Sequence, residues 1–358
     1  MSYQLFSSAK LGNIELANHI VMAPMTRSRA IGNIPTASVV TYYAQRASAG
    51  LIITEGTSPS PNGLGYARIP GIFSAEQIAG WKAVTSAVHE KGGKIFIQLM
   101  HCGRIAHPAN MPEGATIVAP SAVAAAGQMW TDTEGMQAQP TPLALTIDGI
   151  KLTILEYVQA AKNAIEAGFD GVEIHGANGY LIDQFINTKS NLRTDEYGGD
   201  IAGRAKFLLE IAAQTVEAIG KEKVGVRLSP YGAFNDVGFF DTIDTDYQYI
   251  AEKLNEIGVV YTHLVDHSSM GAPAVSKTVV DNIRAAFKGT LILSGGYDVA
   301  RAEADLESGI ADLIAIGRPF IANPDLVERL KQGAELATAN PDLFYSAGDE
   351  GFIDYPAL

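Results

Sequence analysis

The chain has 358 residues, 47% of them hydrophobic and 18% charged, with a formal net charge of -13 at pH 7. The acidic balance argues against nucleic acid or an anionic membrane as a partner, and no apolar run approaches the roughly 18 residues of a membrane span. Cys102 is the only cysteine, which excludes an intrachain disulfide, and the first residues lack the pattern of a signal peptide. We therefore expect a cytoplasmic protein with a single domain over residues 1–358, either a monomer or a weak homo-oligomer.

The N-terminal residues predict a hairpin, because the short segments 5–6 and 13–16 flank a turn at Gly12. After it, short apolar strands alternate with amphipathic helices. The clearest helix start is a capping box made by Ser74 and Gln77. The remaining helices are indicated around residues 39–47, 154–165, 207–219 and 247–257, and the predicted strands are 19–24, 51–55, 94–99, 171–176, 224–228, 261–265, 290–294 and 312–316.

Eight apolar strands that alternate with helices are typical of a parallel sheet covered on both faces. Eight such units predict a (β/α)8 barrel, the TIM barrel. A doubly wound sheet is the competing fold, but no Gly-x-Gly-x-x-Gly follows any strand, so the dinucleotide fingerprint is missing. Residues 102–146, after the third strand, break the alternation of strands and helices. A stretch this long predicts a loop excursion near a functional face.

One short stretch, His175-Gly-Ala-Asn-Gly-Tyr180, carries three polar groups at the end of a predicted strand. His175, Asn178 and Tyr180 are each costly to bury without a partner, whereas a site that donates hydrogen bonds uses all three. The alternative is a strand end whose polar groups only hold the next loop in place.

The carboxyl ends of barrel strands form the active face of this fold, so the residues that end each strand indicate the site. The loops after the last two strands are the usual phosphate cradle, and here they contain Gly295, Gly296 and Gly317, followed by the cation Arg318. The alternative is that these glycines only turn strands into helices. The other strand ends that indicate cofactor contacts are Pro24, Met25, Thr26, Gly56, Gln98 and Arg227.

A phosphate at one rim with Gln98 and Arg227 across the mouth would suit a flavin mononucleotide. The flavin ring has acceptors at N1, O2 and O4 and a donor at N3, Gln98 can both donate and accept, and an arginine near N1 and O2 would stabilise the reduced ring. Arg227 could equally be a structural ion pair that closes the barrel.

These residues carry a resemblance along essentially the whole chain. The sequence resembles the Old Yellow Enzyme family of flavin-dependent alkene reductases, in its classical branch, which includes N-ethylmaleimide reductase-like enzymes. The motifs that carry this resemblance are residues 21–27, 175–180, 193–199, 312–324 and 350–356.

The resemblance implies a barrel that holds noncovalent FMN, with Thr26 on flavin O4, Gln98 and Arg227 on the ring, and the glycine loops with Arg318 on the phosphate. It implies reduction of the C=C bond of α,β-unsaturated carbonyl or nitro compounds. Hydride would pass from NADPH or NADH to flavin N5 and then to the alkene in a ping-pong cycle. His175 and Asn178 would hold and activate the substrate, and Tyr180 would supply the proton.

Four further residues are expected to line the substrate pocket: Tyr66, Met100, Phe234 and Tyr345. Met100 stands where many relatives have tryptophan, and a flexible thioether there should open the pocket and change how the substrate binds. A second departure is Ala202-Gly203-Arg204, where the family has Glu-Asn-Arg before the next helix, and it should affect packing more than chemistry.

Two other functions stay open at this stage. A metal-dependent barrel hydrolase would use His263 and His267, which lie four residues apart at a strand end, although no clear third ligand accompanies them. A non-catalytic flavin-binding module would keep the phosphate site but would have no use for the His175, Asn178 and Tyr180 cluster. We predict an enzyme with FMN and no bound metal.

Overall fold

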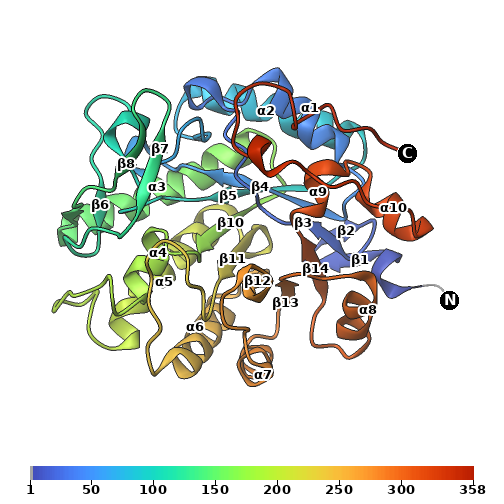
Figure 1. Cartoon of the computed structure of the whole chain (residues 1–358). Helices are drawn as coiled ribbons and strands as arrows, with labels where there is room; N and C mark the ends of the chain where they lie inside the picture. Colours follow the sequence, from blue (N-terminus) through green and yellow to red (C-terminus); the bar gives the residue numbers. More distant parts are fainter. Residues whose placement is uncertain (1–2) are drawn as a thin grey trace.

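Eight parallel strands close into a barrel in the computed structural model, which describes residues 3–358. The last strand pairs with the first, so the sheet has no open edge. Figure 1 shows these strands at the centre of the molecule with the helices around them, and the predicted (β/α)8 barrel is confirmed. The barrel strands are β3 (Ile20–Met22), β4 (Leu51–Thr57), β5 (Ile95–Leu99), β10 (Gly171–Gly176), β11 (Val224–Leu228), β12 (Tyr261–Val265), β13 (Thr290–Ser294) and β14 (Leu313–Ile316).

The helices pack around the barrel through their apolar faces, as the sequence periodicity requires. The capping box at the start of the second helix is confirmed, because Ser74 Oγ accepts from the Gln77 amide at 3.2 Å and Gln77 Oε1 accepts from the Ser74 amide at 3.1 Å. The helices are α1 (Ala37–Gln45), α2 (Ala75–Glu90), α3 (Ile147–Glu166), α4 (Leu181–Ile186), α5 (Ile201–Ile219), α6 (Ile243–Ile257), α7 (Lys277–Ala286), α8 (Val299–Glu307), α9 (Pro319–Ala322) and α10 (Leu326–Gln332).

Helix α5 begins six residues before the predicted start, so Ala202-Gly203-Arg204 lies in its first turn and not ahead of it. A side chain at Gly203 would place its Cβ 2.0 Å from the carbonyl oxygen of Gly198, so only glycine fits this close approach. Arg204 is buried and donates to Asp246 Oδ2 at 2.5 Å. Both residues therefore serve packing.

The N-terminal hairpin is real, but its first strand was placed wrongly. It consists of β1 (Ala9–Leu11) and β2 (Ile14–Leu16) around Gly12, whereas Leu5 lies in a short 3-10 helix. This 3-10 helix contacts α8, because the carboxylate of Glu303 accepts from the Leu5 amide at 3.0 Å. The hairpin closes the base of the barrel, because Leu11 and Leu16 pack in one cluster with residues from inside the barrel.

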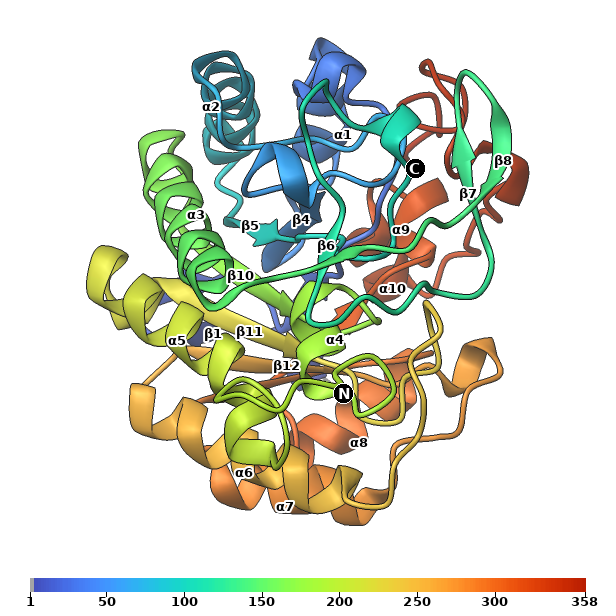
Figure 2. The same cartoon turned by 90° about the vertical axis from the view of Figure 1, so that its left-hand side faces the viewer.

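The excursion after β5 contains two small sheets that were too short to show a period in the sequence. One pairs β6 (Val118–Ala119) with β9 (Leu143–Ala144), and the other is the hairpin of β7 (Gln128–Thr131) and β8 (Gly135–Ala138). Figure 2 shows this hairpin near the C-terminal segment, on the same side of the molecule.

Across residues 3–358, no helix combines the length and apolar character that a bilayer crossing needs.

Candidate active site

A cavity of about 1570 Å³ opens at the carboxyl ends of the barrel strands. It is lined by every residue that the sequence indicated as a cofactor, substrate or catalytic contact, while the role of each stays a prediction. These residues are Pro24, Met25, Thr26, Gly56, Tyr66, Gln98, Met100, His175, Asn178, Tyr180, Arg227, Phe234, Gly295, Gly296, Gly317, Arg318 and Tyr345.

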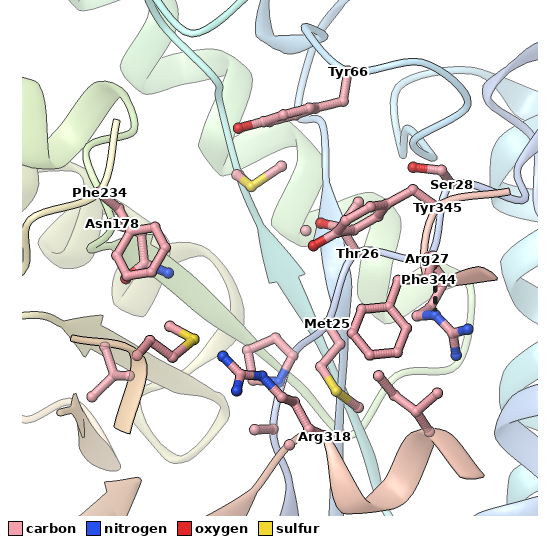
Figure 3. Close-up of a pocket in the computed structure, with 18 of the residues that line it drawn as sticks. Met25, Thr26, Arg27, Ser28, Tyr66, Asn178, Phe234, Arg318, Phe344 and Tyr345 are labelled. Atoms are coloured by element: carbon pink, nitrogen blue, oxygen red, sulfur yellow. Dashed lines mark hydrogen bonds between the residues drawn. The ribbon is translucent and has the colours of Figure 1, made fainter. Parts of the chain in front are cut away.

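The cavity has a cationic end and aromatic walls. Figure 3 shows Arg318 and Tyr66 at opposite ends of the cavity, with Phe234 on one side between them and Phe344 and Tyr345 on the other. In that view Tyr66 lies at the top, Arg318 at the bottom, Asn178 and Phe234 on one side, and Phe344 and Tyr345 on the other.

The loop after β10 presents His175 and Asn178 to the cavity. Asn178 and Gly179 both adopt left-handed backbone conformations, with φ of 61° and 74°. Two bonds hold them there, from the Asn178 amide to Ser229 Oγ and from the Gly179 amide to Asp183 Oδ2, each 2.8 Å long. The loop is therefore fixed before any ligand binds.

His175 is a neutral imidazole with a defined tautomer. Burial lowers its pKa well below the usual value, and the charge of Arg227, its register partner on β11, lowers it further. Nδ1 lies 3.3 Å from the amide nitrogen of Ala177 and accepts its hydrogen. The single proton of the ring is then on Nε2, which is left to donate to a ligand.

Tyr180 lies next to both His175 and a second tyrosine. Its ring meets the His175 ring edge-on at 5.0 Å between centroids, and its hydroxyl lies 3.1 Å from the hydroxyl of Tyr66. Burial raises the pKa of Tyr180 above its usual value, so the hydroxyl keeps its proton at neutral pH. The sequence named both tyrosines but did not show that they touch.

The rim formed by the loops after β13 and β14 fits an anion. Gly295 and Gly296 have φ of 136° and 64°, and a Cβ at Gly295 would lie 2.4 Å from the carbonyl oxygen of Asp266. Gly317 has no side chain to cover its amide, and Arg318 beside it is exposed. Backbone amides without side chains next to a free cation suit a phosphate group.

Met100 is buried at the cavity wall because Gly56 leaves room for it. A Cβ at Gly56 would lie 2.4 Å from Met100 Sδ, so any larger residue on β4 would displace the thioether. The thioether therefore takes a defined position against β4.

The sequence reasoning missed Glu173, a fully buried carboxylate in the middle of β10. It accepts from Gln98 Nε2 at 2.7 Å, from the Tyr261 hydroxyl at 3.1 Å and from His263 Nδ1 at 2.9 Å. The signal was present, because a charged residue two positions before His175 on a strand points to the same side of the sheet.

The two histidines that suggested a metal site are not joined by a third candidate ligand in residues 3–358. His263 uses both ring nitrogens, Nδ1 on Glu173 and Nε2 on Ser294 Oγ at 3.2 Å. His267 packs against Phe234 with ring centroids 4.5 Å apart. Neither arrangement resembles a ligand set for zinc.

The C-terminal loop, residues 341–351, forms one wall of the cavity and was also missed as a structural unit. Arg27 donates to the carbonyl oxygens of Phe344 and Gly351, at 3.1 and 2.8 Å. Arg29 donates to the carbonyl oxygens of Leu343 and Phe344, both at 2.8 Å, and to two others in the loop. These two arginines position Tyr345 at the cavity.

Arg68 connects the β7–β8 hairpin, the C-terminal loop and the loop after β3 at the mouth of the cavity. It forms an ion pair with Asp132, in the turn between β7 and β8, and donates to the carbonyl oxygen of Tyr345 at 2.8 Å. A third bond, to the carbonyl oxygen of Ser28 at 2.9 Å, ties it to the loop after β3.

Comparison with known proteins agrees with this geometry. The model of the NADH:flavin oxidoreductase / NADH oxidase family matches residues 4–337. A probable flavin mononucleotide-dependent alkene reductase of Leishmania infantum is 42% identical over 357 residues, which cover 97% of this chain and 96% of that protein. Of the solved structures, morphinone reductase has a TM-score of 0.96 at 43% identity, covering 100% of this chain and 97% of its own. The old yellow enzyme homologue from Zymomonas mobilis has a TM-score of 0.94 at 39% identity, covering 99% and 100%.

Barrel, cavity and relatives together define an oxidoreductase that uses FMN and a nicotinamide cofactor. Morphinone reductase has also been solved in complex with tetrahydroNAD. The chain belongs to the NADH:flavin oxidoreductase / NADH oxidase family, the Old Yellow Enzyme family, and it is an ene-reductase of that family.

The residues present fit an FMN. Within residues 3–358, Arg227 Nε is buried without a hydrogen-bond partner, and Arg227 lines the cavity. Buried polar atoms of this kind usually meet a partner. A flavin ring supplies acceptors and a donor at the barrel mouth, and its phosphate matches the glycine rim with Arg318.

Proposed function

We propose that this protein reduces the C=C bond of α,β-unsaturated carbonyl or nitro compounds at the expense of NADH or NADPH. The observation that carries the proposal is the pair of donors beside one cavity: the neutral His175, with its proton on Nε2, and the Asn178 amide. Two neutral donors on a loop whose backbone is held in place suit an oxygen that gains negative charge during the reaction.

We assign the FMN ring to Thr26, Gln98 and Arg227, and its phosphate to the glycine rim with Arg318. When bound, the flavin supplies hydride storage, taking a hydride from the nicotinamide and releasing it to the alkene. Arg227 supports this chemistry by placing a permanent positive charge at the barrel mouth.

His175 and Asn178 act on the substrate oxygen. As a hydride reaches the β-carbon, the electron pair of the C=C bond moves towards the carbonyl or nitro group, and its oxygen becomes negative. Donors held in place before the reaction stabilise that charge without reorganising. Because both groups are neutral, this contribution does not depend on a protonation event near pH 7.

Tyr180 supplies the proton that completes the reduction at the α-carbon. Its hydroxyl is protonated at neutral pH, and it lines the cavity beside His175. A positioned general acid is worth roughly 10²–10⁴-fold in rate. The Tyr66 hydroxyl, which accepts from Tyr180 at 3.1 Å, holds the Tyr180 oxygen in place at the cavity.

The experiment that tests the proposal is an anaerobic visible spectrum of the purified protein. NADPH or NADH should bleach the flavin bands, and cyclohexenone should restore them. Bleaching that only oxygen reverses would leave the flavin site intact and overturn the alkene assignment. A colourless protein that does not take up FMN would contradict the site itself.

A further inference from the structure

The centre of the barrel, beneath the cavity, contains a hydrogen-bonded network around one carboxylate. Glu173 accepts from Gln98, Tyr261 and His263, at 2.7, 3.1 and 2.9 Å, and none of these four side chains is more than 2% exposed. His263 continues the network to Ser294, the residue before the glycine rim. The network therefore spans β5, β10, β12 and β13.

Burying a charged carboxylate such as Glu173 lowers the stability of the folded state. A buried carboxylate without compensation costs several kcal/mol, and an apolar residue at the centre of β10 would pack without that cost. The structure retains the charge, and the groups it contacts include Gln98 and, through His263, Ser294, both of which line the cavity. A role at the cavity explains the network better than packing does.

The charge resides on Glu173 and not on His263. The carboxylate accepts three hydrogen bonds, and each of them favours the ionised form. Burial opposes ionisation, but His263, Arg227 and Gln98 together hold the pKa of Glu173 below its usual value. Burial lowers the pKa of His263, which favours its neutral form, with the proton on Nδ1 towards Glu173. Nε2 lies 3.2 Å from Ser294 Oγ, whose hydroxyl also contacts the carbonyl oxygen of Leu264.

We propose that Glu173 is a positioning residue of the flavin site, which orients the Gln98 amide and offsets the charge of Arg227, and thereby sets the reduction potential of the flavin. This inference rests on the proposed placement of the flavin ring against Gln98 and Arg227. Glu173 itself does not line the cavity, so it acts through these two residues.

The orientation of Gln98 follows from the carboxylate. Glu173 can only accept, so Gln98 must turn its Nε2 towards it, and the Gln98 oxygen is left for the cavity. An amide is otherwise free to flip. A fixed acceptor at this place selects the imide N–H of a flavin ring, N3.

Besides orienting Gln98, Glu173 offsets the positive charge of Arg227. Burial lowers the pKa of Arg227, and the charge of Glu173 is the largest opposing influence. Glu173 lies two positions before His175 on β10, and Arg227 is the register partner of His175 on the neighbouring strand β11, so the two charged side chains face the same side of the sheet. With Glu173 ionised, the two charges partly cancel where the reduced ring would carry negative charge. Without it, Arg227 would attract the reduced flavin more strongly, and the potential would become more positive.

The test is the midpoint potential of FMN in the Glu173→Gln variant, measured by anaerobic dye-coupled titration of the holoenzyme. Glutamine keeps the size of the side chain and removes the charge. We expect a potential more positive than that of the wild type. Tyr261→Phe is the matched control, because it removes one donor to the same carboxylate without changing any charge, and it should shift the potential less. An unchanged or more negative potential in Glu173→Gln overturns the proposal.

Binding of FMN methylated at N3 measures the orientation of Gln98 separately. The wild type should bind this analogue about 10- to 100-fold less tightly than FMN, because the Gln98 oxygen loses its partner. Glu173→Asp keeps the charge but is too short to hold Gln98, so its discrimination should shrink. If Glu173→Gln does not retain FMN, Glu173→Asp still tests the proposal. Full discrimination in Glu173→Asp overturns the positioning role.

Arg227→Gln separates failure of this inference from failure of the proposed site. Removing the positive charge should make the potential more negative. If Arg227→Gln shifts the potential and Glu173→Gln does not, the site stands and the inference about Glu173 is wrong. If neither variant shifts the potential, the flavin ring lies elsewhere and the proposed placement fails with it.

Discussion

At the scale of single residues, the site depends on hydrogen bonds that fix which atoms can donate. The Ala177 amide occupies Nδ1 of His175, and the carboxylate of Glu173 occupies Nε2 of Gln98. Each bond leaves one defined atom for a ligand, a donor on His175 and an acceptor on Gln98. Such fixed polarity is what electrostatic stabilisation requires, because the site does not have to rearrange when charge develops.

Tyr180→Phe should separate the two half-reactions. Flavin reduction by NADH or NADPH does not use the hydroxyl and should remain close to the wild-type rate, whereas alkene reduction should slow by about 10²-fold. Stopped-flow absorbance measures both steps in one preparation. Slower flavin reduction with normal alkene reduction would contradict the role given to Tyr180.

Asp183 gives the protein a pH-dependent stability. Burial raises its pKa to about 7, from 3.8, so the folded state binds an extra proton between these values. Its stabilising contribution is full below about pH 4 and is lost as pH rises through 7, at up to about 1.4 kcal/mol per pH unit. Glu55, with a pKa also raised to about 7, acts in the same direction.

Asp183→Asn should therefore flatten this dependence. The asparagine can still accept from the Gly179 amide but carries no charge at any pH. We expect the unfolding free energy of the variant to fall less than that of the wild type between pH 5 and pH 8, in urea titrations at each pH. Parallel curves for the two proteins would show that Asp183 does not titrate in the folded state.

Residues that end strands could be predicted, and residues inside strands could not. His175, Asn178 and Gln98 were indicated because the barrel places strand ends at one face. Glu173 shares the face of β10 with His175, two positions away, but this local pattern does not show which groups the carboxylate contacts. Its three partners come from β5 and β12, and contacts between distant strands are absent from a local pattern.

At the scale of elements, the cavity walls are held by arginines that bind backbone carbonyl oxygens. Arg27 and Arg29 extend from the loop after β3 to residues 341–351. Carbonyl oxygens are the same in every residue, so these contacts leave no trace in the sequence of the loop. Helix α2, in contrast, was predicted correctly at its start because its capping box depends on two specific side chains.

Arg29→Met should loosen this loop. The change removes bonds from a charged donor to several carbonyl oxygens, which should cost about 2 kcal/mol, and Tyr345 should lose its position. Limited proteolysis should cut within 341–351 faster than in the wild type, and KM for the alkene should rise. Arg284→Met is the control, since Arg284 binds the carbonyl oxygens of Phe287 and Gly289 far from the loop. Equal cleavage in both variants would refute the assignment.

At the scale of the whole molecule, the barrel is closed at its base and open at its mouth. Leu11 and Leu16 of the hairpin close the base, and the cavity of about 1570 Å³ occupies the other end. The count of eight strands predicted the closed barrel, because each strand needs two neighbours and only closure supplies them. The sequence did not predict that the hairpin closes the base, since its side chains could pack against either surface.

FMN should stabilise the whole protein, because it binds the folded state only. At a concentration of 100 times Kd, the gain in unfolding free energy should be about 2.7 kcal/mol, and Tm should rise with added FMN. Riboflavin, which lacks the phosphate, should raise Tm less in the wild type. In Arg318→Ala the difference between FMN and riboflavin should shrink. An equal response of the wild type to both flavins would place the phosphate away from Arg318.

The pairing of β3 with β14 also determines when the molecule can be completed during translation. β3 leaves the ribosome among the first strands and has only β4 beside it until residues 313–316 have been made. An unpaired strand edge is a template for wrong association, so the nascent chain is exposed to this hazard while the segment between β4 and β14 is made. Residues 341–351 emerge later still, so the growing chain completes this cavity wall only after all eight barrel strands have been made.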